Sequence, residues 1–337
     1  MIFPKWISQG DIIGVTAVSD GVSDELDKIR FNNGREKLQK SGYPVVMTQN
    51  VFTADEKGRS SDGVTRATQF SHLLEDNNVG CIISAKGGNY LNEMLEFFDF
   101  DSFVKRPVWF QGYSDNTWLI HTLTTVYDIA TIYGNNFGDF GMDNWHPSIW
   151  DNIDLLEGKK DTFGSYEKYQ DGFADRHTGL ESYELKKNVK WKIMNSDSAH
   201  FSGRMIGGCL DVLLFIQGTK YDNTLSFIEK YKSDGIVWYL ESFATDSENL
   251  MMFLWKLKEI GWFKHCNGVI FGRPMFYNTF SDTSYEEAVR YVFGKLEIPV
   301  VFDCDFGHKP PRMPIVNGAV ADVSVECGRG TIKYGFK

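Results

Sequence analysis

Three residues of this chain have the types and surroundings needed for nucleophilic acyl transfer. Ser114 follows an apolar stretch that ends in Gly112 and precedes a segment with helical spacing. A serine on such a strand-to-helix turn exposes its hydroxyl beside amide N–H groups that can stabilise an oxyanion. Asn116 stands where the G-x-S-x-G pattern has its second glycine. Capping of the helix by Ser114 or Asp115 is the structural alternative.

A nucleophilic serine needs a base, and the base needs an orienting carboxylate. Of the seven histidines, His308 follows an apolar strand and lies in a proline-rich loop, whereas His72 and His121 fall within helical patterns. Glu241 ends an apolar strand predicted to begin at residue 235. A charge at the ligand-facing end of a sheet is a candidate for the orienting acid, and an ordinary strand-terminal charge is the alternative.

Composition narrows the class of protein. The chain has 337 residues, a formal net charge of -10 and a pI near 5.2, which argue against a nucleic-acid partner. Its five cysteines are widely spaced, and we find neither a signal peptide nor a membrane-spanning apolar run. We therefore expect a reduced, cytoplasmic protein that does not bind a membrane. No pair of histidines has metal-ligand spacing, and no dinucleotide fingerprint follows the first strand.

The elements that position these residues alternate between strand and helix in the first part of the chain. Strands are predicted at 11–18, 44–48, 81–84, 108–112 and 130–133, and helices at 24–41, 61–74, up to residue 98 and from residue 115. This alternation predicts an α/β domain at 1–155, with a parallel sheet of flavodoxin or Rossmann type.

The pattern changes after residue 155. Residues 156–195 are polar and rich in Gly and Tyr, and we interpret them as a linker with a substrate-covering loop, or else as an irregular surface linker. Residues 196–337 are predicted to form a second, mixed α/β domain. Its strands are expected at 235–240, 268–271, 300–302 and 323–325, and its helices at 211–215, 247–259 and 285–294.

Several motifs together resemble the LD-carboxypeptidase family of serine peptidases, which includes the microcin C self-immunity peptidases. They lie, in the family's order, at 10–15, 87–88, 112–117, 202–210, 240–241, 272–274 and 305–308. The resemblance covers nearly the whole chain. Each motif alone is unspecific, but the ordered set is not.

This resemblance implies a mechanism. Ser114 would be the nucleophile, His308 the base and Glu241 the residue that orients it, while the backbone N–H groups of Gly88 and Asp115 would form the oxyanion hole. The family also implies two domains with the active site between them, a homodimer, and no metal or cofactor.

Two substrate classes are known within the family. One is a peptidyl- or aminoacyl-nucleotide of the microcin C type, and the other is a murein tetrapeptide that loses its terminal D-Ala. The segment 86–93 and the long aromatic insertion at 162–183 resemble the first type. Because that insertion lacks tryptophan, stacking on a nucleobase would fall to an aromatic residue among Phe163, Tyr166, Tyr169 and Phe173. The expected substrate-binding residues are Gly87, Asn116, Cys209, Arg273, Phe163 and Tyr166.

Two other functions share parts of this pattern. A non-catalytic ligand-binding protein on the same fold would use Ser114 only as a helix cap. A general α/β-hydrolase esterase would also order its triad as serine, acid and histidine, but the missing second glycine and the second half of the chain argue against it.

Overall fold

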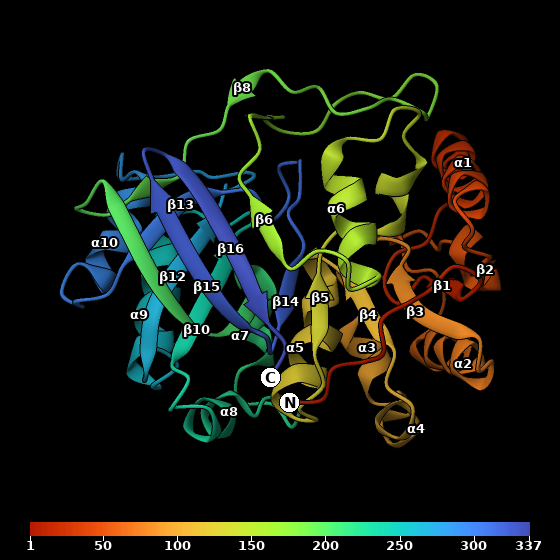
Figure 1. Ribbon diagram of the computed structural model, residues 1–337, viewed down its shortest axis with the longest axis horizontal. Helices are drawn as coiled ribbons and strands as arrows, with labels where there is room; N and C mark the ends of the chain where they lie inside the picture. Colours follow the sequence, from red (N-terminus) through yellow and green to blue (C-terminus); the bar gives the residue numbers. More distant parts are fainter.

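Two β-sheets, one from each half of the chain, organise the structure (Figure 1). The computed structural model describes all 337 residues. The first sheet has six strands in the order β14-β5-β4-β3-β1-β2, and all but β14 run parallel to their neighbours. The parallel strands are β1 (Ile12–Thr16), β2 (Val45–Met47), β3 (Val79–Ser84), β4 (Trp109–Gly112) and β5 (Thr131–Tyr133).

Helices cover the first sheet on both faces. The chain passes from β1 to β2 in one direction and from β2 through β3 and β4 to β5 in the other. Right-handed crossovers therefore place α1 on one face and α2, α4 and α5 on the opposite face. The helices of this half are α1 (Glu25–Lys40), α2 (Gly63–Glu75), α3 (Asn92–Leu95), α4 (Phe100–Lys105), α5 (Thr117–Thr125) and α6 (Pro147–Leu156), with short 3-10 turns η1 (Gln49–Phe52), η2 (Ser114–Asn116) and η3 (Phe137–Gly141).

Side-chain caps fix where several helices begin. Asp24 accepts hydrogen bonds from the backbone N–H groups of Leu26 and Asp27 at the start of α1, and Asp62 caps α2. Asp246 caps α9, and Ser284 forms a capping box with Glu287 at the start of α10. The predicted parallel α/β architecture of the first half is confirmed, and α9 spans the predicted residues.

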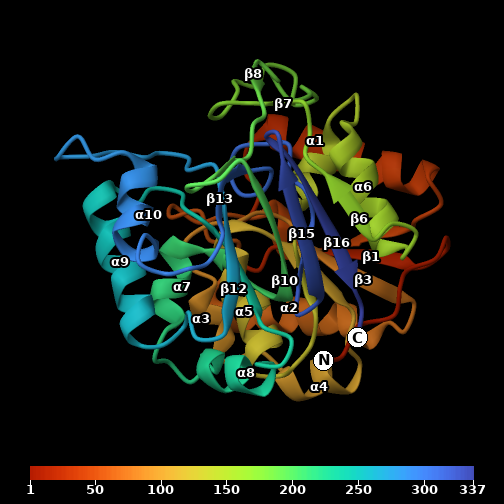
Figure 2. The ribbon, with the colours of Figure 1, turned by 60° about the vertical axis from the view of Figure 1, so that its left-hand side comes forward.

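The second sheet is mixed, as predicted, with the order β6-β16-β15-β10-β11-β12-β13-β9. Its central strands β10 (Ser198–Cys209), β11 (Ile236–Glu241), β12 (Cys266–Gly272) and β13 (Val300–Cys304) are parallel, and β15 (Val320–Glu326), β16 (Arg329–Gly335), β6 (Thr162–Gly164) and β9 (Lys192–Ile193) pair antiparallel. Its helices are α7 (Leu210–Ile216), α8 (Thr224–Lys230), α9 (Ser247–Glu259) and α10 (Tyr285–Phe293). Figure 2 shows α7, α9 and α10 along one face of this sheet.

Three short strands pair outside the expected boundaries. β6 and β9 belong to the second sheet although both lie within the expected linker at 156–195. β14 (Ile315–Asn317) comes from the second half and pairs antiparallel with β5 of the first sheet. The rest of the linker includes a small hairpin of β7 (Lys168–Tyr169) and β8 (Lys187–Asn188), and it crosses above both halves in Figure 1.

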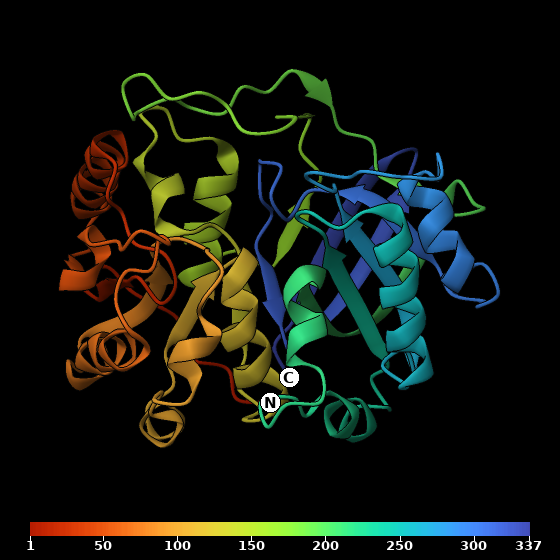
Figure 3. The same ribbon diagram turned by 180° about the vertical axis from the view of Figure 1, so that it is seen from behind.

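One continuous hydrophobic core spans both sheets. At their junction, the rings of Tyr133 and Tyr239 lie 5.3 Å apart, and Asn317 donates a hydrogen bond to the Tyr239 hydroxyl at 2.7 Å. The two chain termini lie side by side on the face opposite the crossing loop (Figure 3). No helix has both the length and the apolar character needed to cross a bilayer.

Candidate active site

Ser114 occupies a sharp turn between β4 and α5. Its φ angle is 66°, in the left-handed region that residues other than glycine rarely adopt. The turn is tight: a Cβ at Gly112 would lie 2.7 Å from Cγ of Asn116. The Asn116 amide is fully buried and donates hydrogen bonds to the carbonyls of Tyr113 and Lys86. Asn116 thus holds the turn in place and does not face a pocket, contrary to the expectation that it binds substrate.

The structure brings Ser114, His308 and Glu241 together from separate parts of the chain. Nε2 of His308 lies 2.9 Å from Oγ of Ser114, and Nδ1 lies 2.9 Å from Oε2 of Glu241. An ionised carboxylate only accepts hydrogen bonds, so Nδ1–H donates to Glu241 and Nε2 is left to accept the serine proton. The Ser114 side chain makes no helix-capping hydrogen bond.

Tyr133 completes this hydrogen-bonded chain, although sequence analysis did not identify it. Its hydroxyl donates to Oε1 of Glu241 at 2.5 Å and accepts from the backbone N–H of Ser114 at 3.0 Å. Burial alone would raise the pKa of Glu241, but nearby His308 and hydrogen bonds from His308 and Tyr133 lower it below its usual value. The carboxylate is therefore ionised at neutral pH, as an orienting acid must be.

Gly88 and Asp115, whose N–H groups are the expected oxyanion donors, line the same pocket as Ser114. Gly88 has a φ of 154°, and a Cβ there would lie 2.3 Å from Oδ1 of Asp20, so the close approach requires glycine. Its N–H donates no hydrogen bond within the protein. Asp115 follows the nucleophile, and its carboxylate is fixed by the Ser19 hydroxyl at 2.5 Å and the N–H of Leu91 at 2.9 Å. Together they offer the donors that an oxyanion requires.

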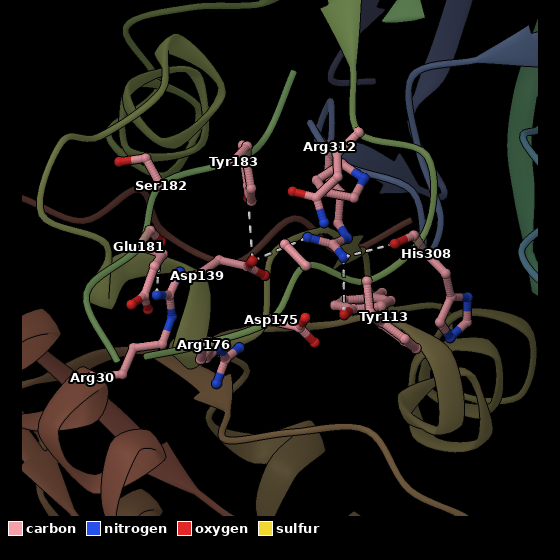
Figure 4. Close-up of a pocket in the computed structure, with 14 residues that line it drawn as sticks. Arg30, Tyr113, Asp139, Asp175, Arg176, Glu181, Ser182, Tyr183, His308 and Arg312 are labelled. Atoms are coloured by element: carbon pink, nitrogen blue, oxygen red, sulfur yellow. Dashed lines mark hydrogen bonds and ion pairs between the residues drawn. The ribbon is translucent and has the colours of Figure 1, made fainter. Parts of the chain in front are cut away.

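The loop that carries His308 is fixed by Arg312, a second residue that the sequence did not single out. Its guanidinium donates to the carbonyls of Gly307 and His308, to the Tyr113 hydroxyl and to the carboxylate of Asp139 (Figure 4). Arg312 and His308 are buried, and Tyr113 and Asp139 are half-buried. A planar guanidinium with several fixed partners holds the loop more rigidly than a single contact could.

Two pockets open beside the triad. The first, which we call the lid pocket, lies on the His308 side beneath residues 170–183 and is shown in Figure 4. It is lined by Arg30, Tyr113, Asp139, Gln170, Phe173, Ala174, Asp175, Arg176, Glu181, Ser182, Tyr183, His308, Pro310 and Arg312. A neighbouring hollow shares Tyr113 and Phe173 and reaches Gly87.

The second, which we call the Cys209 pocket, lies on the Ser114 side. It is lined by Gly88, Asn89, Asn92, Ser114, Asp115, Trp118, Cys209, Asp211, Val212, Phe215, Phe243 and Ala244. Burial raises the pKa of the Cys209 thiol well above its usual value, so the thiol is neutral. Gly87 and Cys209, both expected near substrate, thus lie beside these openings.

Three expected substrate-binding residues face neither pocket, and these expectations are corrected. Phe163 is fully buried in β6, where it pairs with Ile332 of β16. Tyr166 is also buried and donates its hydroxyl proton to Asp151 at 2.9 Å. Arg273 is buried in an ion pair with Asp305. These side chains hold the second sheet and the base of the loop together.

Tyr183 also lines the lid pocket, but Phe173 is the more exposed loop aromatic there. Its side chain is 64% exposed, and it lines both the lid pocket and the neighbouring hollow. It belongs to the same aromatic insertion as Phe163 and Tyr166, whose rings are buried.

Comparison with known proteins agrees with this geometry. Residues 13–134 match the LD-carboxypeptidase N-terminal domain, and residues 202–323 match its C-terminal domain. The microcin C7 self-immunity protein MccF of Escherichia coli is 28% identical over 92% of this chain and 90% of its own length.

Two solved structures of MccF share the fold. The complex with aspartyl sulfamoyl adenosine has a TM-score of 0.82 and 22% identity over 100% of this chain and 99% of that one. The complex with glutamyl sulfamoyl guanosine has a TM-score of 0.80 and 22% identity over 99% and 98%. The two domain matches, in order and over most of the sequence, show that this chain belongs to the LD-carboxypeptidase family of serine peptidases.

Proposed function

We propose that this protein is a serine amidase that hydrolyses the amide bond between an aminoacyl or peptidyl group and a nucleotide-like leaving group. The observation that carries this proposal is the unbroken hydrogen-bonded chain from Ser114 through His308 to Glu241. A serine held at positive φ, as Ser114 is, supports it, because backbone strain clusters at functional turns.

In this mechanism Oγ of Ser114 attacks the amide carbonyl carbon while Nε2 of His308 takes the hydroxyl proton. The ionised Glu241 stabilises the imidazolium, and the N–H groups of Gly88 and Asp115 stabilise the oxyanion. When the C–N bond breaks, His308 returns the proton to the leaving nitrogen. Water, activated by the same histidine, then hydrolyses the acyl-serine ester and restores the hydroxyl.

The lid pocket supports a polar, partly aromatic leaving group. It combines the exposed ring of Phe173 with the guanidinium groups of Arg30 and Arg176. An aromatic face and donors beside it suit a nucleoside. The similar protein MccF binds aminoacyl sulfamoyl nucleosides, which contain an acyl group and a nucleoside of this kind.

A second candidate follows from the family itself, whose name denotes removal of a terminal D-amino acid from a peptide. The two candidates share the triad and differ in what occupies the lid pocket. A murein tetrapeptide would place D-Ala there, whose methyl group offers no aromatic face to the ring of Phe173.

The test uses purified wild-type protein, Ser114→Ala and Glu241→Gln, with products followed by mass spectrometry. One substrate is an aminoacyl sulfamoyl adenosine, offered with several acyl groups, and the other is a murein tetrapeptide ending in D-Ala. Release of the free amino acid by wild type and not by Ser114→Ala supports the proposal, and Glu241→Gln should lower turnover with little loss of binding. Release of D-Ala alone favours the second candidate. Equal cleavage by wild type and Ser114→Ala would contradict both.

A further inference from the structure

The Cys209 pocket contains no basic side chain. The pocket is open to solvent and has a volume of about 510 Å³, which is large enough for any amino-acid side chain. Half of its lining residues are apolar, among them Trp118, Phe215 and Phe243. The amides of Asn89 and Asn92 also line it, but no Lys, Arg or His does. The ionisable carboxyl groups in the wall are those of Asp115 and Asp211.

The proposed function decides which part of a substrate enters this pocket. The nucleoside leaving group is assigned to the lid pocket, and His308, which must give its proton to the leaving nitrogen, is among the residues that line it. The carbonyl oxygen must lie against Gly88 and Asp115, which line the Cys209 pocket with Ser114. The acyl group, with its side chain, therefore occupies the Cys209 pocket.

Hydrogen bonds fix the orientation of both carboxyl groups in that wall. Asp211 accepts hydrogen bonds from the N–H groups of Phe243 at 2.9 Å and Ala244 at 3.1 Å. Asp115 is held by Ser19 and Leu91. A carboxylate on the acyl side chain would lose water beside these groups and gain no counter-ion, which is costly in a partly enclosed site. An apolar or aromatic side chain would instead contact Trp118 and Phe243.

We propose that the Cys209 pocket selects substrates with apolar or aromatic acyl groups and rejects aspartyl and glutamyl groups. The inference rests on the proposed function, because it assumes acyl transfer at Ser114. It separates this chain from the similar protein MccF, which has been solved with aspartyl and glutamyl sulfamoyl nucleosides. Rejection through a missing counter-ion is a form of specificity that a single added cation can reverse.

The selectivity is measured first as binding, which does not require turnover. Calorimetric titration of Ser114→Ala with phenylalanyl sulfamoyl adenosine and with aspartyl sulfamoyl adenosine should give a Kd at least about tenfold lower for the phenylalanyl compound. Equal affinities, a preference for the aspartyl compound, or no binding of either would overturn the inference. Cleavage of the same compounds by wild type tests the proposed function separately: a binding preference without any cleavage would leave the pocket assignment standing and refute the hydrolysis.

A gain of function tests the charge argument directly. Ala244 is exposed at the pocket wall and can be replaced without disturbing the core. In the Ser114→Ala background, Ala244→Lys should tighten binding of aspartyl sulfamoyl adenosine by about tenfold or more, since it supplies the missing cation. Ala244→Met, of similar length and without charge, should not. The same change in both variants would overturn the role of charge.

Discussion

The hydroxyl of Tyr133 lies 2.5 Å from Oε1 of Glu241 and accepts a hydrogen bond from the N–H of Ser114. Tyr133 ends β5 in the first sheet, whereas Glu241 ends β11 in the second. One hydroxyl thus joins the nucleophile turn to the carboxylate across the two sheets. Its position makes it a positioning residue for the proposed reaction, because it contacts two members of the triad and not the substrate.

Tyr133→Phe should lower kcat by about 10- to 100-fold, since a hydrogen bond to a charged group contributes about 1.5–3 kcal/mol. KM should change little, because neither pocket is lined by Tyr133. The matched control is Tyr239→Phe. The Tyr239 hydroxyl accepts a hydrogen bond from Asn317 at the same junction of the sheets and makes no hydrogen bond to the triad. Steady-state kinetics of both variants check the prediction. An equal fall of kcat in both would show that the junction, and not the contact with Glu241, is responsible.

The backbone strain at Ser114 predicts an unusual order of stabilities. Ser114→Ala and Ser114→Gly should both be inactive, but the glycine variant should be more stable to urea by about 1 kcal/mol, because glycine adopts a φ of 66° without steric cost. The control pair is Ser71→Ala and Ser71→Gly within α2, where glycine should instead be less stable by about 1 kcal/mol. If glycine is the less stable variant at both positions, the turn at Ser114 is not strained.

The sequence was informative where the chemistry depends on local chain order. An apolar strand, Gly112, Ser114 and a helix follow one another directly, so the nucleophile turn could be predicted without knowledge of the fold. Glu241 and His308 were found because each follows or ends a buried strand at the same edge of its sheet.

Contacts between distant segments could not be predicted in this way. Phe163 and Phe173 lie in the same aromatic insertion, but Phe163 pairs with β16 and is buried, whereas Phe173 is exposed. The role of Tyr133 depends on the distance between two sheets, which no periodicity encodes. The return of β14 to the first sheet is likewise a consequence of tertiary packing.

Phe173 and Phe163 should therefore respond in opposite ways to truncation. Phe173→Ala should raise KM for an aminoacyl sulfamoyl adenosine with little change in stability, because stacking of a base on an aromatic ring is worth about 1–3 kcal/mol. Phe163→Ala should lower the free energy of unfolding by about 3–5 kcal/mol, because it leaves a cavity in the core. Urea unfolding and steady-state kinetics of both variants measure the contrast. An unchanged KM for Phe173→Ala would show that the ring of Phe173 does not contribute to substrate binding.

Asp20 should make the stability of the protein depend on pH. Its carboxyl group lies against Gly88 and Gly58, and burial raises its pKa from the usual 3.8 to about 6, with Lys86 opposing and Asp115 adding to the shift. A carboxyl with a raised pKa in the folded state binds protons that the unfolded state has already released. Its stabilising effect is therefore complete below about pH 4 and is lost as the pH rises through about 6.

The side chain at position 20 cannot ionise in Asp20→Asn, so this variant lacks the loss of stability that the ionisation of Asp20 causes in the wild type. Urea unfolding at intervals between about pH 4 and 7 should show wild type becoming steadily less stable relative to Asp20→Asn. Asp99→Asn is the control. Hydrogen bonds from the side chain and the backbone N–H of Ser102 lower the pKa of Asp99, so its titration falls below this window and its difference from wild type should stay constant. Parallel curves for Asp20→Asn and wild type would show that Asp20 has the same pKa in the folded and unfolded states, and that burial beside Gly88 does not raise it.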